Sequence, residues 1–345
     1  MKLSIVIPAY NVENYIGYTL KSLIKQTNKQ FEVIIINDGS TDNTLKIIEN
    51  IMSESDLINY KIINQENGGV SLARNRGLAH AIGKYVLFLD GDDYVASDFV
   101  ETVFQYINQQ EYDVICWAFD TVTEEKNVIE NYFEVYRLRG RKMKGIEALK
   151  NMINYNLWIC TASAVYRRKF LLEYNLKYTE GCVCGEDLEL TFKALTRANN
   201  VIFIDKVLSY YVQRRGSITE SYNIKKFDAV LAMERAFNYI NKQIDIEKEE
   251  LIIPHYLYHF SLLIKLLQQK GYSYKKCIKV LVSDLDQNYP GLRQEMLSMM
   301  KKYKGKDYKL LLKIKAFLIS PFFYNFLLDV KIKLNKVSSK VNFME

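Results

Sequence analysis

The fold of this 345-residue chain is decided by the stretch Tyr85-Val86-Leu87-Phe88-Leu89-Asp90-Gly91-Asp92-Asp93. Its first five residues are apolar strand formers, which is typical of a central strand covered on both faces of a parallel sheet. The carboxylates that follow lie where open α/β sheets bind ligands, at the carboxyl end of the strand. Crowded carboxylates repel one another, and a hard divalent cation relieves that repulsion. A solvated acidic turn is the alternative interpretation.

Three more apolar strands precede this stretch and alternate with helices. We expect strands at 3–7, 31–36 and 60–63, and helices at 12–26, 41–52 (capped by Ser40 or Thr41) and 70–81. The repeated strand–helix order predicts right-handed crossovers and a parallel sheet.

After about residue 95 the pattern of strands and helices is mixed, and from about residue 223 onward it is nearly all helical. The fold class expected is therefore α/β, with a mostly parallel sheet flanked by helices and a helical C-terminal appendage. We expect one domain over residues 1–220, divided into two halves at 1–95 and 96–220. The helical region should cover 221–345.

Charge and cysteine content narrow the classes of partner. The net charge is +7, but residues 301–345 hold eleven lysines and three acids, so residues 1–300 are close to neutral. A local basic segment argues against a general nucleic-acid surface. The five cysteines show no zinc-type spacing, which favours reduced thiols in the cytoplasm. No apolar run reaches the ~18 residues of a membrane span.

Polar loops follow all four predicted strands, at what should be one edge of the sheet. Candidate nucleotide contacts in the first are Pro8, Ala9, Tyr10 and Glu13, and in the others Asp38, Gly39, Asn67, Gly68, Arg74, Asp90, Gly91 and Asp92.

The chemistry of these side chains suits a nucleoside diphosphate. Tyr10 offers a flat face to a base, and the N-terminus of the helix expected from Val12 would point to the site. Asp38 can accept a hydrogen bond from a base N–H, and Arg74 can pair with phosphate. Each loop by itself is also compatible with an ordinary turn; four at one edge favour a site.

The motifs resemble those of glycosyltransferase family 2, whose members are inverting enzymes of the GT-A fold. The resemblance rests on Ser4–Asn11, Asn37–Asp42, Ala73–Gly77 and Phe88–Asp93; it is specific over residues 3–95 and weaker to about 220. Among such proteins the chain looks similar to bacterial capsule and exopolysaccharide glycosyltransferases.

The resemblance implies a nucleoside-diphosphate sugar donor, most often a UDP-sugar, and Mn²⁺ or Mg²⁺. It makes residues 1–95 the nucleotide-binding half and 96–220 the acceptor half. By that similarity Asp38 would contact uracil, with Tyr10 or Pro8 beside it. Asp90 would bind ribose or metal-bound water, and Asp92 would ligate the metal. The role of Asp93 stays open.

Inverting transfer needs a carboxylate base, and the segment Gly185–Glu189 supplies two candidates at the start of a predicted helix. A carboxylate is favoured there by the helix dipole. Family 2 members carry a Glu-Asp pair at this relative place, so Asp187 is the expected base and Glu186 the fallback. Simple N-terminal capping is the alternative.

A basic loop follows the last predicted strand. Arg214 or Arg215 would close over the diphosphate and stabilise its departing charge. A solvated basic turn is the alternative. Some relatives carry a metal-binding His in this region, and this chain has none there.

The C-terminal segment 301–345 combines lysines with a short aromatic-rich apolar stretch, interrupted by Pro321. That composition favours a helix lying in the interface of an anionic membrane. A helix pair that packs on the catalytic domain or across a homodimer is the alternative.

These observations predict a metal-dependent inverting glycosyltransferase that moves a hexose or N-acetylhexosamine from a UDP-sugar. The expected acceptor is a lipid-linked saccharide in surface-polysaccharide synthesis, at the cytoplasmic face of the cell membrane. Alternatives are a glycosyltransferase acting on a protein-linked glycan, a nucleotidyltransferase making NDP-sugars, and a non-catalytic binding protein.

Overall fold

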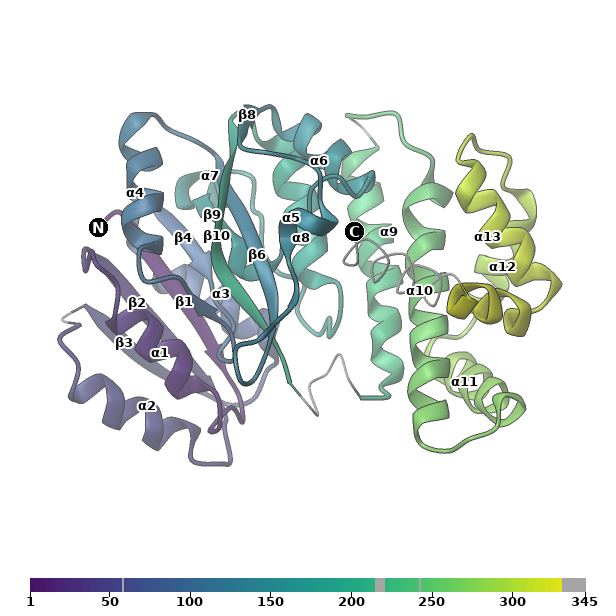
Figure 1. Ribbon diagram of the computed structural model, residues 1–345, viewed down its shortest axis with the longest axis horizontal. Coiled ribbons are helices and arrows are strands. Elements are labelled where there is room, and N and C mark those ends of the chain that lie inside the picture. Colours follow the sequence, from purple (N-terminus) through teal and green to yellow (C-terminus); the bar gives the residue numbers. More distant parts are fainter. Residues whose placement is uncertain (58, 215–220, 242, 331–345) are drawn as a thin grey trace, which may run out of the picture. The chain divides into compact units, whose positions relative to one another are not determined.

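The computed structural model describes the chain except residues 58, 215–220, 242 and 331–345, and the described part contains a ten-stranded sheet (Figure 1). The strands are β1 (Leu3–Ala9), β2 (Phe31–Asp38), β3 (Tyr60–Gln65), β4 (Tyr85–Phe88), β5 (Tyr94–Val95), β6 (Val114–Thr123), β7 (Val128–Glu130), β8 (Arg141–Met143), β9 (Ala164–Arg167) and β10 (Val201–Gln213).

The helices of the sheet-containing part are α1 (Ile16–Ile24), α2 (Thr44–Ser53), α3 (Val70–His80), α4 (Phe99–Gln109), α5 (Tyr132–Val135), α6 (Gly145–Ile153), the 3₁₀ turn η1 (Thr161–Ser163), α7 (Arg168–Glu173) and α8 (Glu186–Arg197). The later helices are η2 (Ile224–Phe227), α9 (Asp228–Ile240), α10 (Lys248–Gln269), α11 (Tyr274–Asn288), α12 (Leu292–Lys302) and α13 (Tyr308–Ile319).

The first half of the sheet is parallel, as the strand–helix order predicts. Strands run in the order β3-β2-β1-β4, and each neighbouring pair is parallel. The second half is mixed: β9 lies antiparallel between β4 and β6, whereas β6 and β10 run parallel to each other. Consequently the ends of β1 to β4 that carry the four polar loops meet at one edge.

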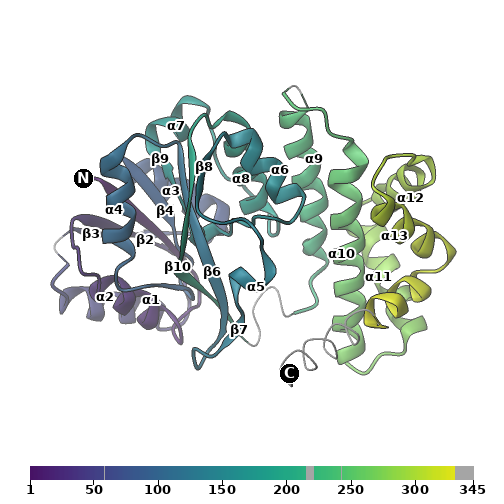
Figure 2. The same cartoon turned by 45° about the horizontal axis from the view of Figure 1, so that its top comes forward.

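Both faces of β1 are covered, which explains why its residues are all buried. Leu3, Ile5 and Ile7 belong to a core cluster that includes residues of α1, α2 and α4. Val6 points the other way, toward Gly77 of α3. Helices α1 and α2 pack side by side, as a second view shows (Figure 2).

Two helices start later than the sequence predicts. Helix α1 begins at Ile16 rather than Val12, because Asn11 adopts a positive φ of 50° and a turn covers the next residues. Helix α2 begins at Thr44 rather than Thr41, with Asn43 as N-cap. Neither Ser40 nor Thr41 caps it, so that prediction was wrong.

The chain divides into two compact units. One comprises Met1–Ser217 with Asn238–Ile244, and the other Ile218–Phe237 with Asp245–Glu345. In the second unit the rings of Tyr256, Phe260 and Phe317 pack together, with centroids 5.1 to 6.1 Å apart. Among the helices of the described residues, none has both the length and the hydrophobicity that a bilayer span requires. A functional boundary at residue 220 stays a prediction.

Candidate active site at the carboxyl edge of the sheet

The loops after β1 and β2 are joined by hydrogen bonds. The Asn11 side-chain oxygen accepts from the Thr41 N–H (2.8 Å), and the Glu13 carboxylate accepts from the N–H of Asn43 (2.9 Å). Glu13 thereby occupies the N-terminus of α2, the position at which a carboxylate stabilises a helix. Its geometry supports a role in shaping the loop; the prediction that it contacts nucleotide stays open.

Tyr10 is half exposed (49%) beyond the buried end of β1, where Pro8 and Ala9 lie in the strand. Its ring is thus available for stacking. Gly91 packs against that same strand end, because a Cβ there would lie 3.1 Å from the Pro8 carbonyl oxygen. The first and fourth loops are therefore in contact.

Asp38 is buried and organises the third loop. Its two carboxylate oxygens accept from the Gln65 amide (2.6 Å) and from the N–H groups of Gly68 (2.8 Å) and Gly69 (2.9 Å). Gly39 has a φ of +70°, and a Cβ there would come within 2.7 Å of the Asn67 nitrogen. The second and third loops are therefore tightly packed on each other, and only glycine fits at position 39.

Arg74 projects from α3 and is buried at 3% exposure. Its two terminal nitrogens bind different acids: one donates to Asp90 (2.6 Å) and the other to Glu186 on α8 (2.9 Å). The sequence predicts phosphate pairing for Arg74, which stays untested. In this structure Arg74 links the segment Asp90–Asp93, called the acidic motif below, to the first turn of α8.

The acids of the motif face different partners. Asp92 accepts from the Arg214 Nε at 2.6 Å, and Asp93 accepts from the backbone N–H of Val212 at 2.9 Å. Burial raises the pKa of Asp92, as does the neighbouring Asp90, whereas Arg214 opposes the shift. Burial and its acidic neighbours also raise the pKa of Asp93 well above its usual range. Arg215 lies outside the described residues.

The Glu-Asp pair opens α8 after Gly185, which has a φ of 82°. Glu186 is buried against Arg74, and burial together with the adjacent Asp187 raises its pKa to about 7 while Arg74 opposes the rise. Asp187 is only partly buried; its carboxylate accepts from the Leu188 N–H (2.7 Å) and the Thr161 hydroxyl (3.4 Å). The two acids therefore differ in exposure: Glu186 is buried and paired with Arg74, whereas the Asp187 carboxylate is partly exposed.

The acidic motif fits a divalent cation completed by phosphate. In the described part of the chain, no group of three or more His, Cys, Asp or Glu side chains is arranged to hold a metal by itself. Nucleotide sites commonly hold Mg²⁺ through one or two carboxylates plus phosphate oxygens. Each of Asp90 and Asp92 accepts from an arginine, but Arg74 on Asp90 is buried whereas Arg214 on Asp92 is 20% exposed, so Asp92 is the more readily freed for a cation. A cation would also relieve the repulsion among these acids.

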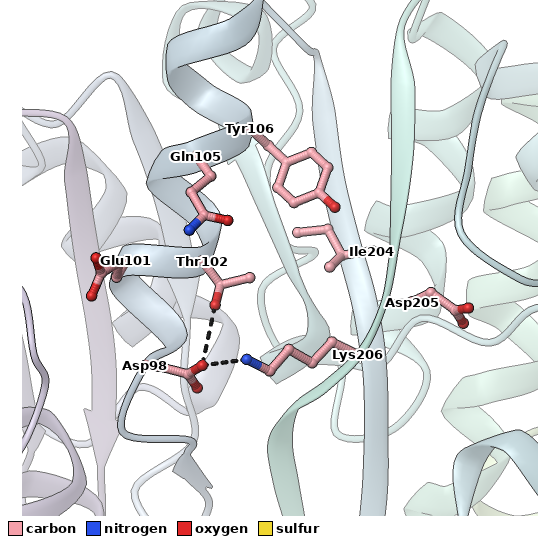
Figure 3. A pocket seen from close by; sticks show the side chains of 8 residues that line it. All are labelled: Asp98, Glu101, Thr102, Gln105, Tyr106, Ile204, Asp205 and Lys206. Carbon is pink, nitrogen blue, oxygen red and sulfur yellow. Dashed lines mark hydrogen bonds and ion pairs between the residues drawn. The ribbon is translucent and has the colours of Figure 1, made fainter.

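A separate pocket of about 360 Å³ lies between α4 and β10 (Figure 3). Asp98 and Lys206 form an ion pair at its edge, and Thr102 donates to the same Asp98 carboxylate. None of the residues predicted to bind donor or metal lines it. A smaller pocket of about 160 Å³ does include Asp92, with Tyr15, Tyr18 and Tyr94 among its lining residues.

The sequence did not indicate two residues of the site. Tyr15 lies under the Arg214 guanidinium, 4.7 Å from ring centre to carbon, and Thr161 contacts Asp187. Neither belongs to a motif, because each meets its partner only when segments distant in the sequence pack together. Tyr15 follows the first polar loop, which is the sole local signal for it.

Comparison with known proteins identifies the family. Residues 4–175 match the family described as Glycosyl transferase family 2. The chain is 30% identical to glycosyltransferase GlyA of Streptococcus pneumoniae over 67% of its own length and 33% of that protein. It is 31% identical to the uncharacterized glycosyltransferase EpsJ of Bacillus subtilis, over 63% of each protein. It thus spans less than two thirds of each of these relatives.

The fold is shared with a solved protein. The crystal structure of Staphylococcus aureus TarS 1–349 in complex with UDP-GlcNAc superposes with a TM-score of 0.62 at 24% identity, covering 87% of this chain and 80% of that one. This likeness confirms the expected fold class, including the C-terminal helices. The chain belongs to glycosyl transferase family 2 and has the GT-A fold.

Proposed function

We propose that this enzyme transfers a hexose or N-acetylhexosamine from a UDP-sugar to a saccharide acceptor, with inversion at the anomeric carbon. The observation that carries the proposal is the partly exposed carboxylate of Asp187, held beside the acidic motif by the Glu186–Arg74–Asp90 chain of ion pairs. A UDP donor is supported by the TarS structures in complex with UDP and UDP-GlcNAc.

Asp187 is the general base in this proposal. It would take the proton of the acceptor hydroxyl as that oxygen attacks the anomeric carbon from the face opposite the diphosphate. Thr161 and the Leu188 N–H orient its carboxylate. Glu186 is turned inward to Arg74, so we assign it to positioning rather than proton transfer.

Asp92, with Asp90 nearby, would hold Mn²⁺ or Mg²⁺. A bound cation supplies positive charge beside the leaving UDP. Tyr10 and Pro8 would lie beside uracil. The Asp38 carboxylate could accept one more hydrogen bond, from the uracil N–H. Asn67, Gly68, Arg74 and Arg214 would line the diphosphate side of the site.

For the acceptor we propose a lipid-linked saccharide used in surface-polysaccharide synthesis. One relative in Staphylococcus aureus, 29% identical over 76% of this chain and 44% of its own length, is named poly(ribitol-phosphate) β-N-acetylglucosaminyltransferase TarS. A polymer acceptor for that protein supports the polysaccharide proposal over a protein-linked glycan. The enzyme would act at the cytoplasmic face of the membrane.

The test is release of UDP from a panel of UDP-sugars, with acceptor fractions and either Mn²⁺ or Mg²⁺. Wild type should release UDP from one donor, and Asp187→Asn should lower the rate by about 10²–10⁴-fold, the usual contribution of a general base. Asp92→Asn should abolish metal-dependent turnover.

A matched control is Asp98→Asn, which changes an acid in the pocket between α4 and β10 and should leave the rate unchanged. Full activity of Asp187→Asn would refute the assignment of the base. No UDP release by wild type from any donor would refute the proposed donor class.

A further inference from the structure

Arg214 occupies the carboxylate that the proposed function assigns to the cation. Its Nε donates to Asp92 Oδ2 at 2.6 Å, and its guanidinium lies 4.7 Å from the centre of the Tyr15 ring. Both side chains of the ion pair are about one fifth exposed, at 20% and 21%. The contact is therefore shielded from water on most sides, and it is stronger than a surface ion pair.

The backbone that carries Arg214 is fixed to the same acidic motif. Two residues earlier, the Val212 N–H donates to buried Asp93 at 2.9 Å, and β10 pairs along its length with β6. Asp93 thus holds the backbone at the end of β10, and the adjacent Asp92 holds the Arg214 side chain. The hydrogen bond that fixes the backbone does not involve the Arg214 side chain, so the two contacts can break independently.

A guanidinium and a divalent cation cannot both occupy the same carboxylate oxygen, because like charges repel at that distance. From this geometry, and resting on the proposed function, we infer that Arg214 is an exchangeable counter-ion. It holds Asp92 in the nucleotide-free enzyme, yields that carboxylate to the cation, and turns its freed guanidinium to the diphosphate of the arriving nucleotide.

This exchange makes cation and nucleotide binding depend on each other. The cation alone must displace Arg214 without any new partner for the guanidinium. With a diphosphate present, the displaced guanidinium gains a bidentate anionic partner. Cation binding should therefore be weak without nucleotide and much tighter with it, and the coupling should depend on Arg214.

The experiment measures Mn²⁺ binding by electron paramagnetic resonance of the free ion, with and without UDP. Arg214→Gln should bind Mn²⁺ on the order of tenfold more tightly than wild type without UDP, and UDP should tighten its binding on the order of tenfold less. Arg214→Lys keeps a charge that can reach Asp92, so its Mn²⁺ affinity without UDP should stay close to that of wild type.

Arg141→Gln is the matched control, because Arg141 forms an exposed ion pair with Glu147. An equal rise in Mn²⁺ affinity in that variant would attribute the effect to net charge and overturn the inference. Unchanged Mn²⁺ affinity in an Arg214→Gln protein that circular dichroism shows to be folded would overturn this inference but not the proposed function. Absence of Mn²⁺ binding by every variant with UDP present would overturn the proposed cation as well.

Discussion

Arg74 is the residue that links the acidic motif to the first turn of α8, which carries the proposed base Asp187. It is buried, and it serves one acid from a strand end and one from the start of α8. Its guanidinium also lies 4.9 Å from the centre of the Tyr178 ring. A planar, permanently charged group is required to bind two carboxylates in different directions, so lysine is a poor substitute.

We predict that Arg74→Met destabilises the protein by about 3 kcal/mol, because breaking a buried ion pair leaves acids without a counter-ion. Adding Glu186→Gln to Arg74→Met should recover part of that loss, because one of the two uncompensated carboxylates is removed. Urea unfolding followed by circular dichroism measures both changes in the free energy of unfolding.

The control for this prediction lies on the same helix. Arg76 donates to the neutral amide of Gln65 at 3.2 Å, so Arg76→Met should cost less than about 1 kcal/mol. Equal destabilisation by Arg74→Met and Arg76→Met would contradict the special role of Arg74.

At the scale of elements, α3 must approach β1 closely to bring Arg74 to the motif. Gly77 makes this approach possible: a Cβ there would lie 2.1 Å from Val6 Cγ1, far inside van der Waals contact. Val6 is fully buried in the centre of the sheet, so it has little room to move. The distance between helix and strand is thus set by a residue without a side chain.

We therefore predict that Gly77→Ala destabilises the enzyme by about 1–3 kcal/mol, the usual cost of overpacking, although alanine is the better helix former. UDP release should also fall, because α3 carries Arg74. Thermal unfolding and the UDP assay measure the two effects.

Gly17→Ala on α1 is the matched control, since its Cβ would lie 3.5 Å from the nearest atom, an ordinary contact. It should be neutral, or stabilising by at most about 1 kcal/mol. Destabilisation of the same size in both variants would show that α3 is not specially constrained.

At the scale of the whole molecule, the second unit exposes an apolar surface that the catalytic chemistry does not require. We call this surface the tail face; it is formed by Ile319, Phe322, Phe323, Phe326 and Leu327. Ile319 is 75% exposed and Phe322 is 57% exposed, whereas Tyr324 and Asn325, which lie between Phe323 and Phe326, are buried. Ile319 ends α13, and Phe322, Phe323, Phe326 and Leu327 are spaced three and four residues apart in the helical segment 321–330, which places these four on one side of that segment.

Lysines surround this surface in sequence, and those of 301–315 are exposed. An apolar face bordered by lysines matches the interface of an anionic membrane. We propose that the tail face binds the membrane that presents the acceptor; the residues of 331–345 predicted to take part lie outside the described residues. Self-association through this face is the competing proposal.

We predict that wild type floats with vesicles containing phosphatidylglycerol and less with pure phosphatidylcholine. In Phe322→Ser/Phe326→Ser the partition coefficient of the protein between vesicles and solution should fall on the order of tenfold, because two aromatic side chains no longer enter the membrane interface. Point variants are preferable to truncation, since Phe317 and Tyr324 of the same segment lie in the core.

Ile82→Ser/Leu172→Ser is a control that removes two exposed apolar side chains from the first compact unit and should leave flotation unchanged. Equal flotation of wild type and Phe322→Ser/Phe326→Ser would rule out the membrane proposal. A dimer mass by light scattering that the phenylalanine variant loses would favour self-association.

Much of the first compact unit could be predicted from local sequence. Apolar runs such as Tyr85–Phe88 mark strands wherever they occur, and the alternation of strands and helices leaves few topologies for residues 1–95. The boundaries were less predictable, because the turn at Asn11 and the hydrogen bonds of Glu13 to the next loop delay the starts of α1 and α2.

The sequence by itself determined the family, the fold class and the edge of the sheet at which the acids gather, because these follow from short motifs and strand order. Only the tertiary structure decided the partners of those acids. Arg74 meets Glu186 across 112 residues, and Arg214 meets Asp92 across 122. Such pairings depend on how distant elements pack and which rotamers then remain, and no local pattern encodes that.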